Sequence, residues 1–404
     1  HPSPTSFAVS YQPPTTFADA RARINAARRA SDLFGTLDGD AARQHDALRE
    51  RYRAFAFIVH ADRNGGDPGA TTAFQRLGTL YESAQQQLRL GTYRRPHALA
   101  ELRHADVTYR LHDIHVRGDV ADLYRATAET ERGTTAPVLV KGARSSANND
   151  LLANEAWALR RLRERVDPRS DDAPLLAHVS PLRASFNVKG RDGTQRRTNV
   201  FDREDGWVSL ADVKRAYPAG IHPADMAWMF NRLLAALALT HGCGLVHGAV
   251  VPAHVLVRPA DHHGRLIDWG YAVPLPSRSK RSRSTGSTPA TGLRVASESI
   301  RAISPPYHAF YPAEVLGKQS PTPGTDLYMA ALTMLWLVGG DEKTQTPPAH
   351  LDPRLVAFFR SCLLLNPARR PQDAWALFGE FRDLLQTLYG PPRFRPFAMP
   401  SNPT

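Results

Sequence analysis

The feature that most constrains the fold of this chain is a change of pattern about halfway along it. Residues 105 to 206 hold short β-forming runs, VTYRL, ADLYRA, APVLVKGA and RRTNVFD, with one amphipathic helical stretch among them. From residue 207 to 390 long helical patterns dominate. Strands followed by helices indicate an α+β body of two lobes, a β-rich lobe and then a helical lobe.

Three shorter segments flank this body. Residues 1–29 read as a Pro- and Ser-rich tail that leads into a helix, and residues 30–95 as a compact helical module. Residues 391–404 are rich in Pro and therefore cannot form a regular helix. A chain of 404 residues is long enough for two or three domains with buried cores.

Composition narrows the class of protein. No stretch approaches 18 uninterrupted apolar residues, so we expect no membrane span. The two cysteines, Cys243 and Cys362, cannot form a disulfide framework, which favours a cytoplasmic location. The net charge of +12 comes from 51 basic residues, of which six are Lys. Such an Arg excess is typical of a GC-rich genome, but it also fits nucleic-acid binding through the basic insert PLPSRSKRSRSTGSTPATG. The sequence has no RNA-binding aromatic motif, zinc finger or helix-turn-helix signature, which favours the compositional explanation.

The helical module reads as two helices joined by a Gly-rich turn. Each helix carries one apolar face, formed first by Leu48, Tyr52, Phe55, Ala56 and Val59 and then by Phe74, Leu77, Tyr81, Ala84 and Leu88. His60, Ala61 and Asp62 stand at the connection, in an arrangement that resembles the J domain of co-chaperones with its His-Pro-Asp turn. The resemblance implies contact with an ATP-dependent heat-shock chaperone. Because Ala61 replaces the Pro that would restrict the turn, we favour a docking or packing module over working co-chaperone activity.

Seven polar residues stand in a fixed order within the two-lobed body. Lys141 ends the strand pattern VLVK, Glu155 lies in the helical stretch that follows, and Asp268 begins an Asp-Trp-Gly turn. The order and spacing of the whole set resemble the protein-kinase family: Lys141, Glu155, His247, Asp268, Glu314, Asp326 and Arg370. The resemblance implies a bilobal kinase-like fold that spans residues 105 to 390.

The resemblance also implies a site for ATP and Mg²⁺. Lys141 and Glu155 would form the ion pair that positions the phosphates, and Asp268 would bind the metal ion. His247 would start the catalytic loop, and Asp326 would anchor the backbone of that loop. Glu314 and Arg370 would form a buried pair with a structural role: Arg370 would lie near the end of the helical lobe.

Several positions depart from the kinase pattern. Ala249 stands where the family has the Asp that accepts the substrate proton, a function typically worth about 10²–10⁴-fold in rate. Gly248 replaces an Arg, and His254 replaces the Asn that holds a second Mg²⁺. His254 is a candidate contact for a phosphate, although we favour a hydrogen-bonded loop residue, since imidazole is a poor Mg²⁺ ligand. In the phosphate loop only the middle glycine, Gly118, is present.

These patterns predict a pseudokinase that binds ATP but is catalytically impaired, and that acts as a switch, scaffold or adaptor for protein partners. An atypical active serine/threonine kinase is the first alternative, because positioning and electrostatics supply much of phosphoryl-transfer catalysis. A J-like adaptor linked to a heat-shock chaperone is the second. Nucleic-acid binding is the least favoured.

Overall fold

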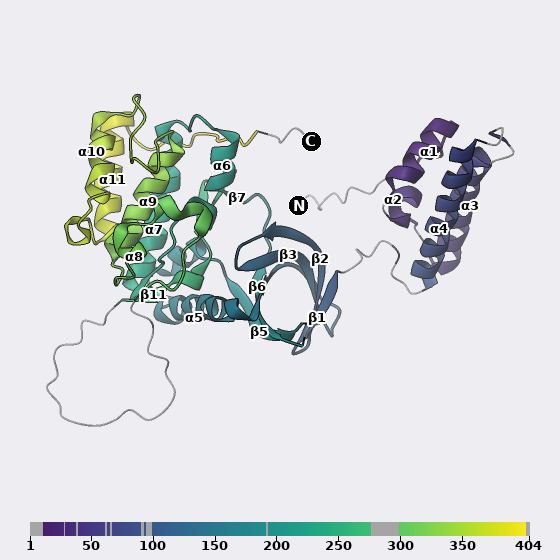
Figure 1. Cartoon of the computed structure of the whole chain (residues 1–404), viewed down its shortest axis with the longest axis horizontal. Helices are drawn as coiled ribbons and strands as arrows, with labels where there is room; N and C mark the ends of the chain where they lie inside the picture. Colours follow the sequence, from purple (N-terminus) through teal and green to yellow (C-terminus); the bar gives the residue numbers. More distant parts are fainter. Residues whose placement is uncertain are drawn as a thin grey trace, which may run out of the picture. The chain divides into compact units, whose positions relative to one another are not determined.

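The computed structural model describes residues 11–400, except residues 28, 38, 61–62, 65–66, 90–92, 94–98, 191–192 and 276–298. The chain divides into two compact units, His1–His97 and Ala98–Thr404 (Figure 1). Ala61, Asp62 and most of the predicted basic insert lie outside the described residues.

The described residues of the first unit form four helices: α1 (Phe17–Ala26), α2 (Ala30–Phe34), α3 (Ala41–Val59) and α4 (Pro68–Arg89). Side-chain caps define two of the starts, because Thr16 accepts a hydrogen bond from the Asp19 N–H and Asp40 accepts one from the Arg43 N–H. The helices α3 and α4 form the expected hairpin, and their apolar faces meet with Leu48, Phe55 and Leu77 fully buried.

The core of this unit also takes in α1. Ala20 and Ile24 of α1 are fully buried in the same cluster as the hairpin residues. The helical core therefore includes residues that precede the predicted start at residue 30. His60 follows the last residue of α3, and its ring contacts the edge of Phe74 at 5.4 Å between ring centroids.

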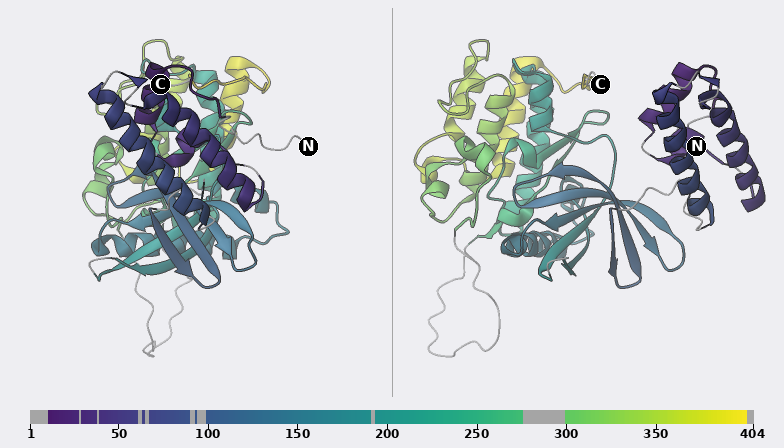
Figure 2. Two further views of the ribbon diagram at one scale, coloured as in Figure 1. Left: turned by 90° about the vertical axis from the view of Figure 1, so that its right-hand side faces the viewer. Right: turned by 45° about the vertical axis from the view of Figure 1, so that its right-hand side comes forward.

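The second unit begins with a six-stranded antiparallel sheet of order β1-β2-β3-β4-β6-β5. The strands are β1 (Ala100–His104), β2 (Val107–Arg117), β3 (Ala121–Thr130), β4 (Thr135–Ala143), β5 (Leu182–Lys189) and β6 (Gln195–Asp202). Figure 2 shows the sheet curling on itself into a half-barrel. Its hollow face is apolar, lined among others by Tyr109, Leu111, Val138, Val140 and Phe186.

A single long helix, α5 (Asn149–Arg165), lies against the other face of the sheet beside β5 and β6 (Figure 1). Its four predicted apolar positions, Leu151, Leu152, Leu159 and Leu162, are all buried. Because side chains alternate across β4, Val138 and Val140 face the hollow while Lys141 points to α5.

The rest of the second unit is mostly helical. Its helices are α6 (Leu210–Ala216), α7 (Pro223–Gly242), α8 (Ala313–Leu316), α9 (Pro323–Leu337), α10 (Pro353–Cys362) and α11 (Ala374–Tyr389). Short strands accompany them: β7 (Val208–Ser209), β8 (Leu245–Val246), β9 (Val255–Arg258), β10 (His263–Leu266) and β11 (Val273–Pro274). The helices α7 and α9 are buried along most of their length, which explains their nearly uninterrupted apolar sequences.

The predicted α+β order, strands before helices, is thus present in this unit. The end of the chain follows the surface of the helical part without forming a helix between residues 391 and 400, as its prolines require. Phe397 and Met399 pack against the core, and the Tyr217 hydroxyl donates to the Ala398 carbonyl. Among the described residues, no helix is both long and apolar enough to cross a membrane.

Candidate functional site

Lys141 lies at the centre of a charged cluster between the sheet and the helical part. Its Nζ is 2.8 Å from Oε1 of Glu155 on α5 and 2.7 Å from Oδ1 of Asp268, which follows β10. Burial acts to lower the pKa of Lys141, but the two carboxylates outweigh it and raise that pKa above its ordinary value. Burial acts to raise the pKa of Asp268, yet Lys141 and His254 hold it well below its usual range. Lys141 and Asp268 are therefore both charged at neutral pH.

The turn that carries Asp268 is held firmly in place. Asp268 has a left-handed backbone with φ of +68°, and Trp269 beside it is fully buried. The Trp269 indole N–H donates to the Leu266 carbonyl, while Asn154 of α5 donates to the carbonyls of Gly270 and Ala272. These bonds tie the turn to α5 and fix the direction of the Asp268 carboxylate.

The second oxygen of Glu155 has a partner that the sequence patterns did not reveal. Asn199 of β6 is fully buried, and its Nδ2 donates to Glu155 Oε2 over 2.8 Å and to the Leu152 carbonyl over 2.9 Å. Ser185 of β5 donates in turn to Asn199 Oδ1 over 2.6 Å. A lone Asn and a lone Ser within strand patterns carry no periodic signal, so only the sheet register brings them to the site.

Asp326 holds the loop that starts at His247. Its carboxylate is fully buried and accepts the backbone N–H groups of His247 and Gly248, each over 2.8 Å, and lies 3.0 Å from Nε2 of His241. This is the geometry that an anchor of the loop backbone requires. Gly248 has a φ of +78°, and a Cβ there would lie 2.8 Å from the Tyr271 carbonyl oxygen. The backbone therefore has no room for the Arg of the kinase pattern without a shift.

His247 itself is a neutral, buried ring. Its Nε2 donates to the Ile267 carbonyl, and its Nδ1 accepts the Ala249 N–H over 3.3 Å. Burial lowers the pKa of His247 to about 4, because removal from water disfavours the charged form of the ring. Ala249 is fully buried and offers only a methyl group where the kinase pattern has a carboxylate.

His254 joins the cluster from the other side of Asp268. Its Nε2 lies 3.3 Å from Asp268 Oδ2, and its Nδ1 lies 2.9 Å from the Ala249 carbonyl oxygen. Both ring nitrogens are thus engaged within the protein, as expected of a hydrogen-bonded loop residue. Sequence order alone gave no sign that His254 would contact Asp268.

The donor set near Asp268 fits one Mg²⁺ better than two. Mg²⁺ prefers oxygen ligands and is commonly held by one or two carboxylates together with substrate phosphates. Asp268 would supply one such carboxylate for an ion shared with a nucleotide, whereas His254 offers nitrogens that are already bonded. Within the described ranges, no three His, Cys, Asp or Glu side chains are grouped so as to hold a metal ion.

The predicted phosphate loop is a tight hairpin turn. The Gly118 N–H donates to the Ala121 carbonyl over 3.1 Å, and a Cβ at Gly118 would lie 2.7 Å from that oxygen. Arg144 donates from Nη1 to the Gly118 carbonyl and from its backbone N–H to the Val120 carbonyl. The glycine is therefore required by the turn itself, and its N–H is already used.

The predicted structural pair, Glu314 and Arg370, is buried and bidentate. Arg370 Nη1 lies 2.5 Å from Glu314 Oε1 and Nη2 lies 3.2 Å from Oε2, with both side chains at most 4% exposed. Thr325 Oγ1 also donates to Glu314, and the guanidinium lies over the Tyr328 ring. All the oxygens of this pair have partners, as a buried ion pair needs.

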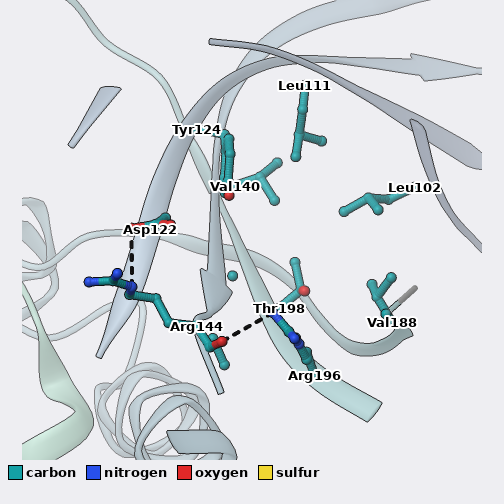
Figure 3. Close-up of a pocket in the computed structure, with 12 residues that line it drawn as sticks. Leu102, Leu111, Asp122, Tyr124, Val140, Arg144, Val188, Arg196 and Thr198 are labelled. Carbon is teal, nitrogen blue, oxygen red and sulfur yellow. Dashed lines mark hydrogen bonds and ion pairs between the residues drawn. The ribbon is translucent and has the colours of Figure 1, made fainter. Parts of the chain in front are cut away.

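A separate cavity of about 230 Å³ lies in the hollow of the half-barrel. Figure 3 shows Leu102, Leu111, Val140 and Val188 pointing into it, with Arg144 and Asp122 at one end. Val140 lines this cavity while the next residue, Lys141, faces the charged cluster. The cavity and the cluster are therefore on opposite faces of β4.

Over part of its length the chain is similar to two known proteins. Over 65 residues the chain is 39% identical to casein kinase II subunit alpha' of Saccharomyces cerevisiae, a match that covers 16% of this chain and 19% of that protein. Over 181 residues it is 23% identical to serine/threonine-protein kinase F of Synechocystis sp., covering 44% of this chain and 32% of that protein. The matches thus span less than a third of either relative. No protein-family model matches the sequence.

The J-like identity of the helical unit stays a prediction. For the larger unit, the distant kinase matches agree with the curled antiparallel sheet, the single helix against it and the helical part that follows. Together they support a protein-kinase-like fold for Ala98–Thr404.

Proposed function

We propose that the unit Ala98–Thr404 is a pseudokinase, which binds a nucleotide and acts as a switch, scaffold or adaptor without efficient phosphoryl transfer. One combination of observations supports this most strongly. Lys141 is held by Glu155 and Asp268 in the arrangement that faces nucleotide phosphates in kinases, while the buried Ala249 stands at the position of the proton acceptor.

Each residue would have a limited part in binding. The Lys141 ammonium would face the phosphates, with Glu155 holding it in place. Asp268 would hold a Mg²⁺ ion, whose contribution is to neutralise phosphate charge. The methyl group of Ala249 has no lone pair to accept a hydroxyl proton, and this loss is typically worth about 10²–10⁴-fold in rate.

Binding is tested by thermal unfolding in the presence of ATP, with and without Mg²⁺. All six tryptophans of the chain lie in Ala98–Thr404, so tryptophan fluorescence follows this unit alone. We expect the midpoint to rise with ATP concentration, with stabilisation of about 2.7 kcal/mol at a concentration of 100 times Kd. Lys141→Met should lose this rise of the midpoint. The matched control Lys189→Met, a change at an exposed Lys of β5, should keep it. A midpoint that ATP does not move would contradict the proposal.

An active kinase is the second candidate, because both matched relatives are named as kinases. Positioning and electrostatics provide much of the catalysis of phosphoryl transfer, so turnover without a base is chemically feasible. Incubation with γ-labelled ATP and candidate acceptor proteins separates the two. Label incorporation that Asp268→Ala abolishes would establish the kinase, whereas intact ATP with measurable binding supports the pseudokinase.

We propose further that the helical unit docks a protein partner. Phe57 on α3 is 62% exposed, and the Arg63 guanidinium lies 3.6 Å from its ring centroid, so an aromatic ring and a cation stand together at the surface of this unit. A heat-shock chaperone is the partner class implied by the J-like pattern. The ATPase rate of such a chaperone, measured with the wild type and with Ala61→Pro, separates a docking module from a working co-chaperone. We expect no stimulation by the wild type, and stimulation would show that the unit is a working co-chaperone.

A further inference from the structure

Two neighbouring strands hold the two oxygens of one carboxylate. Lys141 on β4 and Asn199 on β6 are cross-strand partners in the sheet. Lys141 binds Oε1 of Glu155 over 2.8 Å, and Asn199 binds Oε2 over 2.8 Å. Glu155 is only 2% exposed, so the protein supplies the bonds that water would otherwise make.

Asn199 uses both ends of its amide. Its Nδ2 has two acceptors, Glu155 Oε2 and the Leu152 carbonyl, and its Oδ1 accepts the Ser185 hydroxyl. Ser185 Oγ accepts in turn from Arg197 Nε over 3.1 Å. The amide orientation follows from these partners, because a flipped amide would face the Leu152 carbonyl and the carboxylate with its own oxygen.

Other asparagines tie the same helix at its start and middle. Asn149 at the first turn of α5 donates to the Gln195 carbonyl and accepts the Arg197 N–H, over 2.8 and 2.7 Å. Asn154 bonds the turn after Asp268. If α5 moved away from the sheet, the Glu155 carboxylate would lose its bonds to Lys141 and Asn199, and the Asn199 amide would lose its acceptors on α5. Leaving these buried groups without hydrogen bonds would cost free energy.

We propose that Asn199 is a positioning residue, which holds Glu155 on Lys141 and keeps α5 against the sheet whether or not a nucleotide is bound. A site fixed in advance in this way binds its ligand without first ordering a helix. The expected effect on affinity rests on the proposed nucleotide binding. The holding of α5 is a property of the free protein and is tested separately.

The test is hydrogen exchange by mass spectrometry on the full chain, with ATP affinity measured on the same samples. Asn199→Leu keeps a similar volume and removes the amide. We expect exchange in α5 to rise about tenfold or more relative to α7, and ATP affinity to fall several-fold, since buried hydrogen bonds to a charged group are lost. Ser185→Ala should shift both in the same direction by a smaller factor. Asn187→Leu, at an exposed position of β5, is the matched control and should change neither.

Unchanged exchange in α5 of a folded Asn199→Leu protein would overturn the proposal. If that variant lacks the tryptophan signal of the folded unit, Ser185→Ala decides, and unchanged α5 exchange in it would also overturn the proposal. If the wild type binds no ATP but hydrogen exchange in α5 still rises in Asn199→Leu, the proposed nucleotide binding is wrong while the positioning role of Asn199 is supported.

Discussion

Lys141 and Asp268 are 127 residues apart in the sequence, yet Nζ of one lies 2.7 Å from Oδ1 of the other. The contact joins the sheet to the helical part of the unit. It depends on α5, which supplies Glu155 to Lys141 and Asn154 to the turn after Asp268. The proposed function combines two features: this arrangement of charged groups would bind a nucleotide, and Ala249 supplies no base for phosphoryl transfer.

The buried pair of Glu314 and Arg370 should carry a large share of the stability of the helical part. Arg370→Met leaves a carboxylate unpaired in the interior, and we expect the free energy of unfolding to fall by about 3–5 kcal/mol. Urea unfolding followed by tryptophan fluorescence measures the change. Arg354→Met is the matched control, because the Arg354–Asp352 pair lies at the surface and its loss should change the free energy of unfolding much less. An equal loss of unfolding free energy in the two variants would show that burial does not make the Glu314–Arg370 pair more important for stability.

Gly248 should resist substitution for two separable reasons. Gly248 and Gly133 share nearly the same φ, +78° and +77°, but only at Gly248 does a Cβ meet other atoms. Gly133→Ala therefore measures the cost of the backbone conformation, and Gly248→Ala adds the close approach to Tyr271 and Ile300. We expect Gly248→Ala to lower the free energy of unfolding by roughly 1–3 kcal/mol more than Gly133→Ala. An equal loss of unfolding free energy in both variants would show that the backbone conformation alone causes it, and that the close approach to Tyr271 and Ile300 adds nothing.

The protonation of His247 should make the unit less stable in mild acid. Its ordinary pKa is 6.5, and in the folded protein burial lowers the pKa to about 4. Between these values the unfolded chain binds a proton that the folded chain does not, so stability falls as pH falls from 6.5 to 4 and levels off below. The full effect is roughly 3 kcal/mol.

Urea unfolding at pH 7 and pH 4.5 measures this dependence in the wild type and in His247→Gln. The variant should be less stable at pH 7, because one or both ring hydrogen bonds are lost, but it should show a smaller change with pH. A pH dependence that His247→Gln leaves intact would assign the effect to other groups.

The order of strands and helices could be predicted because the spacing of apolar residues along the sequence differs between strands and helices. Two strands of the sheet, β1 and β5, lie outside the predicted β-forming runs. In β5 an alternating pattern is present, because Leu182, Ala184, Phe186 and Val188 alternate with polar residues, as is typical of a half-buried strand. The edge strand β1, AELRH, is largely exposed and polar, so it has no alternating apolar pattern. Only its pairing with β2 identifies it as a strand.

The candidate site was predictable only in the residues that match a family pattern. Lys141, Glu155 and Asp268 could be named from their order, and the structure brings them together. Asn199 could not be named, because its role comes from its register opposite Lys141, a property of the sheet and not of local sequence. The contact of His254 with Asp268 is likewise a product of tertiary structure.

Isothermal titration of the full chain with ATP and Mg²⁺ is the direct test of a nucleotide site formed by Lys141 and its partners. We expect saturable binding to one site in the wild type, and binding weakened at least tenfold in Lys141→Met, with tryptophan fluorescence used to show that the variant is folded. The exposed-site variant Lys189→Met should bind as the wild type does. A wild-type titration with no saturable heat, at concentrations up to the millimolar range, would contradict the claim.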